Sequence, residues 1–325
     1  MQIMVTGCAG FIGSDLCEYL LAKKHEVIGV DNFNDYYDPN VKEFNVSEYK
    51  NNQRFKLYRV DITDRVALWK VFDENNIEAV VHLAAWAGVT ESIKRPKVYV
   101  DSNIAGTNNL AEFGIQNSLK NFIFASTSSV YGNNQVPYKE EMNTDYPLAP
   151  YPATKKAGEV LLYTYHVNFD LNVTIFRFFN PLGPRLRPDL ALPKLVRAAE
   201  YGYNFTLYQG TDSARDYTCI DDMMDAIHAV LKKPFGYEVM NLGNSDPVKL
   251  QEILESVERV TGKRIKIVKG YRPGQMQITA ADISKARKLV GYNPAVTLDQ
   301  MVEKYFEWFI KQPEWYKKGE ESWMK

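Results

Sequence analysis

The sequence predicts an α/β fold, a doubly wound parallel sheet with a smaller, mostly C-terminal lobe. Short apolar runs rich in β-branched residues recur along the chain, and each precedes a longer stretch compatible with a helix. Runs such as 3–5 and 122–124 are apolar at every position, which is typical of strands that helices cover on both faces. A Gly/Pro-rich passage that begins at Asn180 predicts the start of the second lobe.

The individual elements follow from these runs. Strands are expected at 3–6, 26–31, 55–61, 79–83, 122–126, 173–179 and 238–242. Helices over about 189–201, 249–261 and 298–311 should form the smaller lobe, whereas a helix at 221–231 and the strand at 238–242 should return to the large sheet. The larger domain therefore comprises 1–179 with about 218–246, and the lobe comprises 180–217 with about 247–325. The Lys/Glu-rich tail after Gln312 is expected to be a solvated terminus.

Composition excludes several classes of protein. With 39 Lys+Arg against 40 Asp+Glu the formal charge is -1, so the sequence predicts neither a nucleic-acid partner nor binding to an anionic membrane. The three cysteines form no C-x-x-C pair, and the N-terminus shows no signal-peptide pattern, which favours a cytoplasmic protein. Four scattered histidines without matching cysteine spacing predict no metal site.

A glycine-rich turn joins the first predicted strand to a helix. Gly7, Gly10 and Gly13 permit a tight turn and a close approach of the backbone to a pyrophosphate, which the helix N-terminus attracts. Such a turn by itself is also compatible with a purely structural role. Asp31, however, ends the second strand about 20 residues later, where a carboxylate accepts the adenosine ribose hydroxyls. Because no Arg or Lys stands at 32–34, this Rossmann-type site is expected to bind NAD rather than NADP.

Two further features predict proton chemistry. Tyr151 and Lys155 are four residues apart on one predicted helix face, where a cation favours the phenolate form that abstracts a proton. Thr127 lies in a cluster of hydroxyl residues at the carboxyl edge of the sheet, where open α/β sheets bind ligands. An ordinary helix-face contact and a Ser/Thr-rich turn remain the structural alternatives.

These motifs, with His82-Leu-Ala-Ala, the stretch 128–132 and the stretch 213–222, resemble the extended short-chain dehydrogenase/reductase superfamily, specifically its nucleotide-sugar 4-epimerases. The stretches 31–38, 183–189 and 281–287 are most similar to those of UDP-glucuronate 4-epimerases. The resemblance implies an isomerase in which Tyr151 takes the proton of the 4-hydroxyl, Lys155 holds the phenolate and the nicotinamide ribose, and Thr127 positions the 4-oxygen. It also implies a homodimer formed through the helices near 96–119 and from about 151.

The resemblance implies a set of binding residues as well. Besides the glycines, Asp31, Tyr151 and Lys155, the cofactor site is expected to include Phe11, Ile12, Asn32, Asp61, Ile62, Leu83, Ala84, Ala85, Asn103 and Ala125. For the UDP-sugar, arginines at 215 and 272 match positions that meet phosphate, and Lys194 and Tyr208 are weaker candidates for the uridine pocket. The expected substrate-binding residues are Thr90, Ser128, Ser129, Asn180, Arg187, Lys194, Tyr208, Arg215 and Arg272.

The identity of the sugar stays open at this point. Ser128, Ser129 and Arg187 are candidates to hold the carboxylate of UDP-glucuronate, the favoured substrate. Thr90 and Asn180, however, stand where glucuronate epimerases often have Arg and Thr, which keeps a UDP-glucose or UDP-N-acetylglucosamine 4-epimerase as the alternative. Ser128-Ser129 in place of an acidic pair disfavours a 4,6-dehydratase, and Ser129 in place of Glu disfavours a decarboxylase. A non-catalytic, NAD-sensing protein is the remote alternative.

Overall fold

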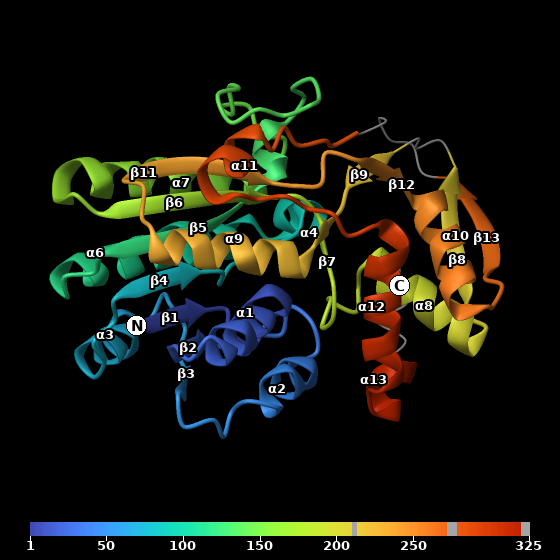
Figure 1. Cartoon of the computed structure of the whole chain (residues 1–325), viewed down its shortest axis with the longest axis horizontal. Helices are drawn as coiled ribbons and strands as arrows, with labels where there is room; N and C mark the ends of the chain where they lie inside the picture. Colours follow the sequence, from blue (N-terminus) through green and yellow to red (C-terminus); the bar gives the residue numbers. More distant parts are fainter. Residues whose placement is uncertain (210–212, 272–277, 320–325) are drawn as a thin grey trace.

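The computed structural model describes residues 1–209, 213–271 and 278–319, and its centre is a parallel sheet (Figure 1). The sheet is seven-stranded and has the order β11-β6-β5-β4-β1-β2-β3. Its strands are β1 (Gln2–Thr6), β2 (Glu26–Asp31), β3 (Phe55–Arg59), β4 (Ala79–His82), β5 (Asn121–Thr127), β6 (Asn172–Phe178) and β11 (Tyr237–Leu242). The chain runs outward from β1 to β3 and then returns to β4 on the other side of β1, which confirms the predicted doubly wound sheet.

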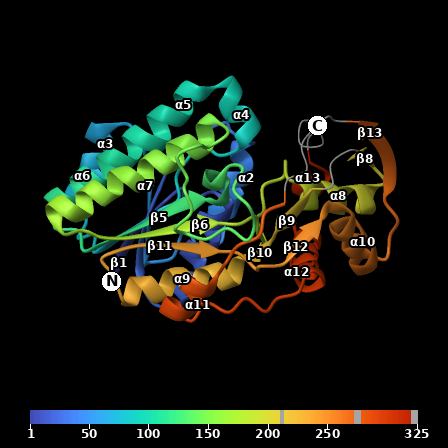
Figure 2. The same ribbon diagram turned by 90° about the horizontal axis from the view of Figure 1, so that it is seen from above.

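Helices cover both faces of the sheet, as Figure 2 shows. On one face lie α1 (Phe11–Ala22) and α9 (Ile220–Lys232), and on the other lie α3 (Arg65–Asp73), α6 (Thr107–Gln116) and α7 (Pro150–Phe169). Each face buries its own apolar cluster, because strands such as β4 and β5 carry apolar side chains in both directions. The continuous apolar runs in the sequence are thus explained by burial on two sides.

The predicted helix near 96–119 is interrupted. The segment consists of α5 (Pro96–Val100), a π-helical stretch Asp101–Gly106 and then α6, and it follows a short helix α4 (Val89–Lys94). Inside the π-helical stretch, the amide of Asn103 donates to the carbonyl of Trp86 (3.0 Å) and to Oγ1 of Thr154 (3.0 Å). These long-range contacts position the wider π-helical turn. Helical periodicity in the sequence cannot predict such contacts.

The smaller lobe contains the three expected helices, α8 (Ala191–Tyr201), α10 (Leu250–Thr261) and α12 (Leu298–Ile310). It also contains two-stranded pairs outside the large sheet that the sequence analysis missed. The pairs are β8 (Asn204–Gln209) with β13 (Lys266–Tyr271), β9 (Ala214–Asp216) with β12 (Pro247–Lys249), and β7 (Pro181–Leu182) with β10 (Thr218–Cys219). As predicted, α9 and β11 return to the large sheet, where β11 pairs with β6. The division into two domains stays a prediction.

The tail after Gln312 is folded as far as it is described, so the expectation of a solvated terminus is wrong there. It forms α13 (Glu314–Lys318), in which Tyr316 is fully buried. The buried guanidinium of Arg197 on α8 donates to the carbonyl of Tyr316 (3.1 Å) and to that of Lys317 (3.2 Å). Two aromatic residues among the charged ones therefore anchor the segment, with Trp315 edge-on to Phe44. Within the described ranges, no helix combines the length and apolar character needed to cross a membrane.

Candidate active site

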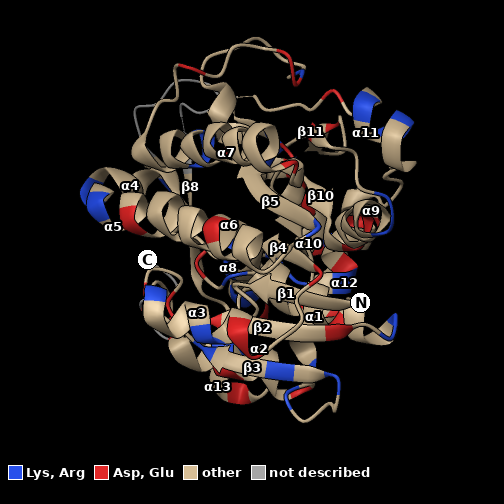
Figure 3. Ribbon diagram, turned by 90° about the vertical axis from the view of Figure 1, so that its left-hand side faces the viewer, with Lys and Arg blue, Asp and Glu red and all other residues tan. Residues whose placement is uncertain are grey.

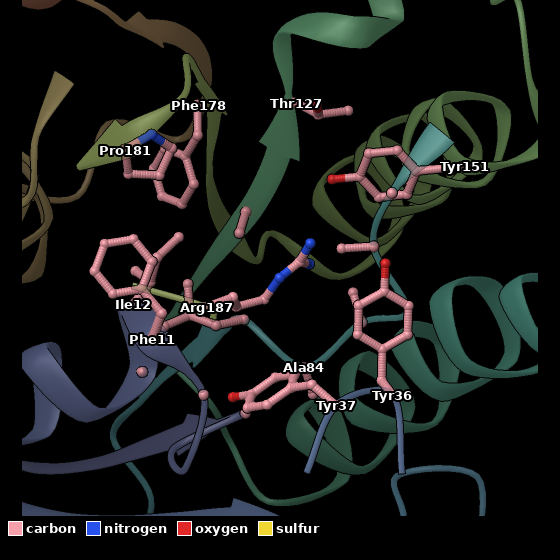
Figure 4. Close-up of a pocket in the computed structure, with 18 of the residues that line it drawn as sticks. Phe11, Ile12, Tyr36, Tyr37, Ala84, Thr127, Tyr151, Phe178, Pro181 and Arg187 are labelled. Carbon is pink, nitrogen blue, oxygen red and sulfur yellow. The ribbon is translucent and has the colours of Figure 1, made fainter. Parts of the chain in front are cut away.

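A cavity of about 500 Å³ opens at the carboxyl edge of the sheet, beside the point where the strand order reverses between β1 and β4 (Figure 4). The large sheet and the passage after Asn180 both contribute to its walls. Most of the predicted site residues line it: Gly7, Gly10, Phe11, Ile12, Gly13, Asp31, Asn32, Asp61, Ile62, Leu83, Ala84, Ala85, Ala125, Thr127, Ser128, Ser129, Tyr151, Lys155, Asn180 and Arg187. The fold thus gathers residues that are up to 180 positions apart.

The glycine turn needs glycine for steric reasons. Gly7 has a φ of +72°, and a Cβ there would lie 2.8 Å from the backbone nitrogen of Ala84. A Cβ on Gly13 would lie 2.0 Å from the carbonyl oxygen of Gly7, so the first turn of α1 packs directly against the strand end. The N-terminus of α1, with Phe11 at its start, therefore faces the cavity with unpaired backbone N–H groups, an arrangement that fits a dinucleotide pyrophosphate.

Asp31 ends β2 and is held by backbone donors. Its carboxylate accepts from the N–H of Ala9 (3.1 Å) and of Phe33 (2.8 Å). Burial raises the pKa of this carboxyl, and the charge of Lys42 opposes the rise. Lys42 lies on α2 (Pro39–Ser47) and lines the same cavity, with its Nζ donating to the carbonyl of Asn34 (2.7 Å). The sequence analysis considered cations only at 32–34. It missed Lys42 because α2 brings this residue back to the ribose end of the site.

Tyr151 and Lys155 both face the cavity from the start of α7. Burial raises the pKa of the Tyr151 phenol, while hydrogen bonding with Thr127 and the charge of Arg187 lower it. Burial also lowers the pKa of Lys155 to about 7, and its Nζ lies 4.3 Å from the ring centre of Phe124. The sequence analysis expected the charge of Lys155 to favour the phenolate of Tyr151. In the structure, the charge that lowers the pKa of Tyr151 is that of Arg187.

A buried ion pair lies behind Lys155. Glu159, one helical turn further along α7, accepts from the guanidinium of Arg177 at 2.7 Å and 3.0 Å and from the hydroxyl of Ser126 at 2.5 Å. Because Arg177 is on β6 and Ser126 is on β5, this network fixes α7 against two strands. The negative charge of Glu159 raises the pKa of Lys155, but burial lowers this pKa by more.

Thr127 and its neighbours form the end of β5. Oγ1 of Thr127 accepts from the backbone N–H of Ser129 (3.2 Å) and so caps a 3-10 turn, Ser128–Tyr131. This turn directs Ser128 and Ser129 to the cavity beside Tyr151. The cluster of hydroxyl residues is therefore a wall of the site as well as a turn.

Other predicted residues lie elsewhere. Asn103 is buried below the cavity wall, where it also accepts from the N–H of Trp86 (2.9 Å), and Thr90 is exposed on α4. Lys194 and Arg215 do not line the cavity; Nη1 of Arg215 donates to the carbonyl of Ala214 (3.4 Å). The side chain of Tyr208 and the whole of Arg272 lie outside the described residues.

Sequence reasoning missed four aromatic residues of the cavity wall, Tyr36, Tyr37, Phe178 and Tyr217. The signal for the first two was the stretch 31–38, which the resemblance singled out as a whole without assigning roles to its members. The ring of Tyr36 lies edge-on to Trp86, with the ring centres 5.3 Å apart, and its hydroxyl closely approaches Gly88. Tyr36 therefore reaches from the segment after β2 to the segment after β4.

The fold and this site define an extended short-chain dehydrogenase/reductase, a doubly wound sheet that combines a dinucleotide turn with a Tyr-x-x-x-Lys pair. A family model described as GDP-mannose 4,6 dehydratase matches residues 4–305, and the chain belongs to this family. The predicted resemblance to nucleotide-sugar epimerases is confirmed by the relatives of the chain.

The relatives are similar over nearly their whole length. The UDP-glucuronate 4-epimerase of Thermodesulfobacterium geofontis is 40% identical over 307 residues, which cover 94% of this chain and 95% of that protein. A crystal structure of the UDP-glucuronic acid 4-epimerase from Bacillus cereus in complex with UDP-glucuronic acid and NAD has a TM-score of 0.88 and 36% identity, covering 95% of this chain and 98% of that one. A UDP-glucose 4-epimerase from Thermotoga maritima with UDP-glucose has a TM-score of 0.87 and 28% identity, covering 96% and 99%.

Proposed function

We propose that the protein is an NAD-dependent UDP-sugar 4-epimerase, an isomerase that interconverts UDP-glucuronate and UDP-galacturonate. The observation that carries this proposal is that Thr127, Tyr151 and Lys155 face the same cavity as the glycine turn and Asp31. A proton-transfer group thus lies at the reacting end of a dinucleotide site. The curated relative from Thermodesulfobacterium geofontis and the structure from Bacillus cereus support the same activity.

The cofactor site fits NAD. The helix N-terminus at Phe11 would meet the pyrophosphate, Asp31 would accept the adenosine ribose hydroxyls, and Lys155 would hold the nicotinamide ribose, since all three line the cavity. Bound NAD supplies a reversible acceptor for the hydride of carbon 4. Because Asp31 is buried and already accepts two backbone hydrogen bonds, a 2′-phosphate would meet a fixed carboxylate at this point.

The side chains perform the proton chemistry. Tyr151 takes the proton of the 4-hydroxyl as the carbon 4 hydride leaves, and Thr127 donates a hydrogen bond that positions the 4-oxygen. The 4-keto sugar then turns about its diphosphate and presents its other face, after which Tyr151 returns the proton. The hydride also returns, so the net reaction is redox-neutral and inverts carbon 4 alone.

The carboxylate of the sugar distinguishes the two candidate substrates. The hydroxyls of Ser128 and Ser129 lie beside Thr127 and are suited to hold a hexuronate. The presence of Thr90, where glucuronate epimerases often have Arg, is only a weak argument against the acid substrate. Thr90 is exposed and does not line the described cavity. Asn180 does line it, and its amide donates to the carbonyl of Asp216 (3.1 Å). The similarity to a UDP-glucose 4-epimerase and Asn180 keep a neutral UDP-sugar as the second candidate.

We also propose a homodimer formed through α5 and α7, which pack against each other; α7 lies above and to the right of α5 in Figure 3. Val160, Tyr163 and Val167 follow helical spacing on the outer side of α7, and each is at least half exposed. Val100 on the adjacent α5 is 47% exposed. An apolar stripe that spans two neighbouring helices supports an interface with a second copy.

A cytoplasmic location is supported by three cysteines that are all free and buried.

The direct test incubates the purified protein, without added NAD, separately with UDP-glucuronate, UDP-glucose and UDP-N-acetylglucosamine. Proton NMR then follows the hydrogen on carbon 4 of each sugar. Conversion of UDP-glucuronate to its galacto epimer without loss of carbon dioxide is the expected result. Conversion of a neutral sugar alone would favour the second candidate. No conversion of any of them, even after NAD is supplied, would contradict the proposed function.

A further inference from the structure

Arg187 occupies the middle of the cavity. Figure 4 shows its guanidinium projecting between Phe11 and Ile12 on one side and Tyr36 and Tyr151 on the other. It comes from the passage that follows β7, in which Arg185 pairs with Asp15 and Glu18 of α1, and its side chain extends from that side toward Tyr36 and Tyr151 (Figure 4). The sequence analysis gave this arginine as a candidate for the sugar carboxylate, and the structure places it between residues expected to bind the cofactor and Tyr151.

Its electrostatic neighbours define this position further. Burial is the largest influence on the pKa of Lys42 and on that of Tyr151, and the charge of Arg187 lowers both. Lys42 marks the ribose end of the site beside Asp31, whereas Tyr151 marks the reacting end. Lys42, Arg187 and Tyr151 all line the described cavity, and the pyrophosphate of a bound dinucleotide would lie between its ribose end and its reacting end.

The guanidinium is held in place with one nitrogen to spare. Asp189 accepts from Nε (3.1 Å) and Nη2 (3.0 Å), and the ring of Tyr36 lies beneath, with its centre 4.9 Å from the Arg187 Cζ. The other terminal nitrogen, Nη1, has no hydrogen-bond partner among the residues described by the structure. An oriented arginine with a free N–H pair is a phosphate donor.

We propose that Arg187, supported by the ring of Tyr36, binds the cofactor pyrophosphate together with the N-terminus of α1 and retains the dinucleotide through the catalytic cycle. Retention has a chemical reason, which rests on the proposed function. The keto sugar is reduced by the same cofactor that accepted its hydride, so a cofactor lost between the two steps would strand the intermediate. Tyr36 acts as a positioning residue for Arg187, because its ring lies against the guanidinium.

The test measures cofactor retention directly. Wild type, Arg187→Met, Tyr36→Phe and Tyr36→Leu are purified, their folding is checked by circular dichroism, and bound NAD is quantified after exhaustive dialysis. Loss of the charge-assisted phosphate contact should raise the NAD dissociation constant by roughly 10- to 100-fold in Arg187→Met. Tyr36→Phe, which keeps the ring, should retain NAD as wild type does, and Tyr36→Leu should retain less.

Arg95→Met is the matched control. Arg95 also stacks on an aromatic ring, that of Trp86 (4.7 Å), but it is exposed and does not line the described cavity. Full NAD retention by Arg187→Met would overturn the proposal, and a selective loss of UDP-glucuronate turnover in that variant would return Arg187 to the carboxylate. A wild type that retains NAD through Arg187 but epimerises no UDP-sugar would contradict the proposed function and leave the cofactor contact intact.

Discussion

Tyr151 and Lys155 illustrate how one environment acts on two groups of opposite type. Burial disfavours the charged form of each, so it raises the pKa of the phenol and lowers that of the ammonium. In the ligand-free protein, burial favours the neutral form of both groups. The charges that favour the phenolate of Tyr151 are those of Arg187 and of the cofactor once it is bound. The residue pair is therefore prepared for proton transfer only in the loaded site.

Replacing Tyr151 by Phe removes the proton-transfer group and keeps the ring. We expect turnover to fall at least about 100-fold, the lower end of what acid–base catalysis contributes. NAD content, measured by release and chromatography, should stay close to that of wild type. Unchanged turnover would show that another group moves the proton and would favour the non-catalytic alternative.

Lys155 also predicts a pH dependence of stability in the cofactor-free protein. Its pKa is about 7 when folded against an ordinary 10.5, so above pH 7 the unfolded chain holds a proton that the folded protein lacks. The free energy of unfolding should therefore rise with pH from 7 toward 9, by no more than about 1.4 kcal/mol per pH unit, and should not vary through this group below pH 7. Urea unfolding at pH 6, 7, 8 and 9, as the difference between wild type and Lys155→Met, checks this. A difference that is flat above pH 7 would contradict it.

At the scale of elements, the junction of β1 and α1 determines whether the cofactor site exists. The backbone of the glycine turn touches both the first turn of α1 and the segment after β4. No side chain fits between these surfaces, so the sequence constraint is steric rather than chemical. Helix α7 has a different constraint, because Glu159 is tied to β5 and β6 and so orients Lys155 one turn earlier.

Gly13→Ala tests the junction. Its Cβ would lie 2.0 Å from the Gly7 carbonyl oxygen, so α1 must move away from the turn. We expect a loss of about 1–3 kcal/mol in the free energy of unfolding, together with weaker NAD binding, measured by urea titration and fluorescence. Gly10→Ala is the milder comparison, because its Cβ would approach the same oxygen only to 3.3 Å. Equal effects of the two substitutions would argue against the steric explanation.

At the scale of the whole molecule, several exposed apolar residues of α7 lie on the helix that packs beside α5, which carries the exposed Val100. Helix α7 packs on β5 and β6, and α5 packs on α7, so the outer sides of both helices are available to the proposed second copy. Because the same helix α7 carries Tyr151 and Lys155, a dimer formed there would also support the site.

Val160→Glu and Val167→Glu together test this interface. Two charges on the apolar stripe should convert the dimer to a monomer in analytical ultracentrifugation, because a buried unpaired charge is costly. Val66→Glu, on the 70% exposed valine of α3, is the control and should leave the assembly unchanged. A wild type that sediments as a monomer would rule out the proposed homodimer.

Local patterns in the sequence determined the large sheet, its order of elements and the motif positions. Continuous apolar runs imply burial on both faces, glycine spacing implies a close backbone approach, and a Tyr-x-x-x-Lys spacing implies a shared helix face. Each of these signals lies within a few residues, so the chain itself carries it. The family resemblance extended them to the cofactor and the substrate class.

Only the tertiary structure decided which distant side chains meet. Lys42 and Tyr36 enter the cavity because the segment after β2 folds back over the sheet edge, and Arg187 reaches it from the passage after β7. The burial of Tyr316 and the short strand pairs of the smaller lobe likewise depend on partners far away in the chain. Such contacts leave no periodicity in the sequence, because their energy comes from surfaces that meet only after the chain has folded.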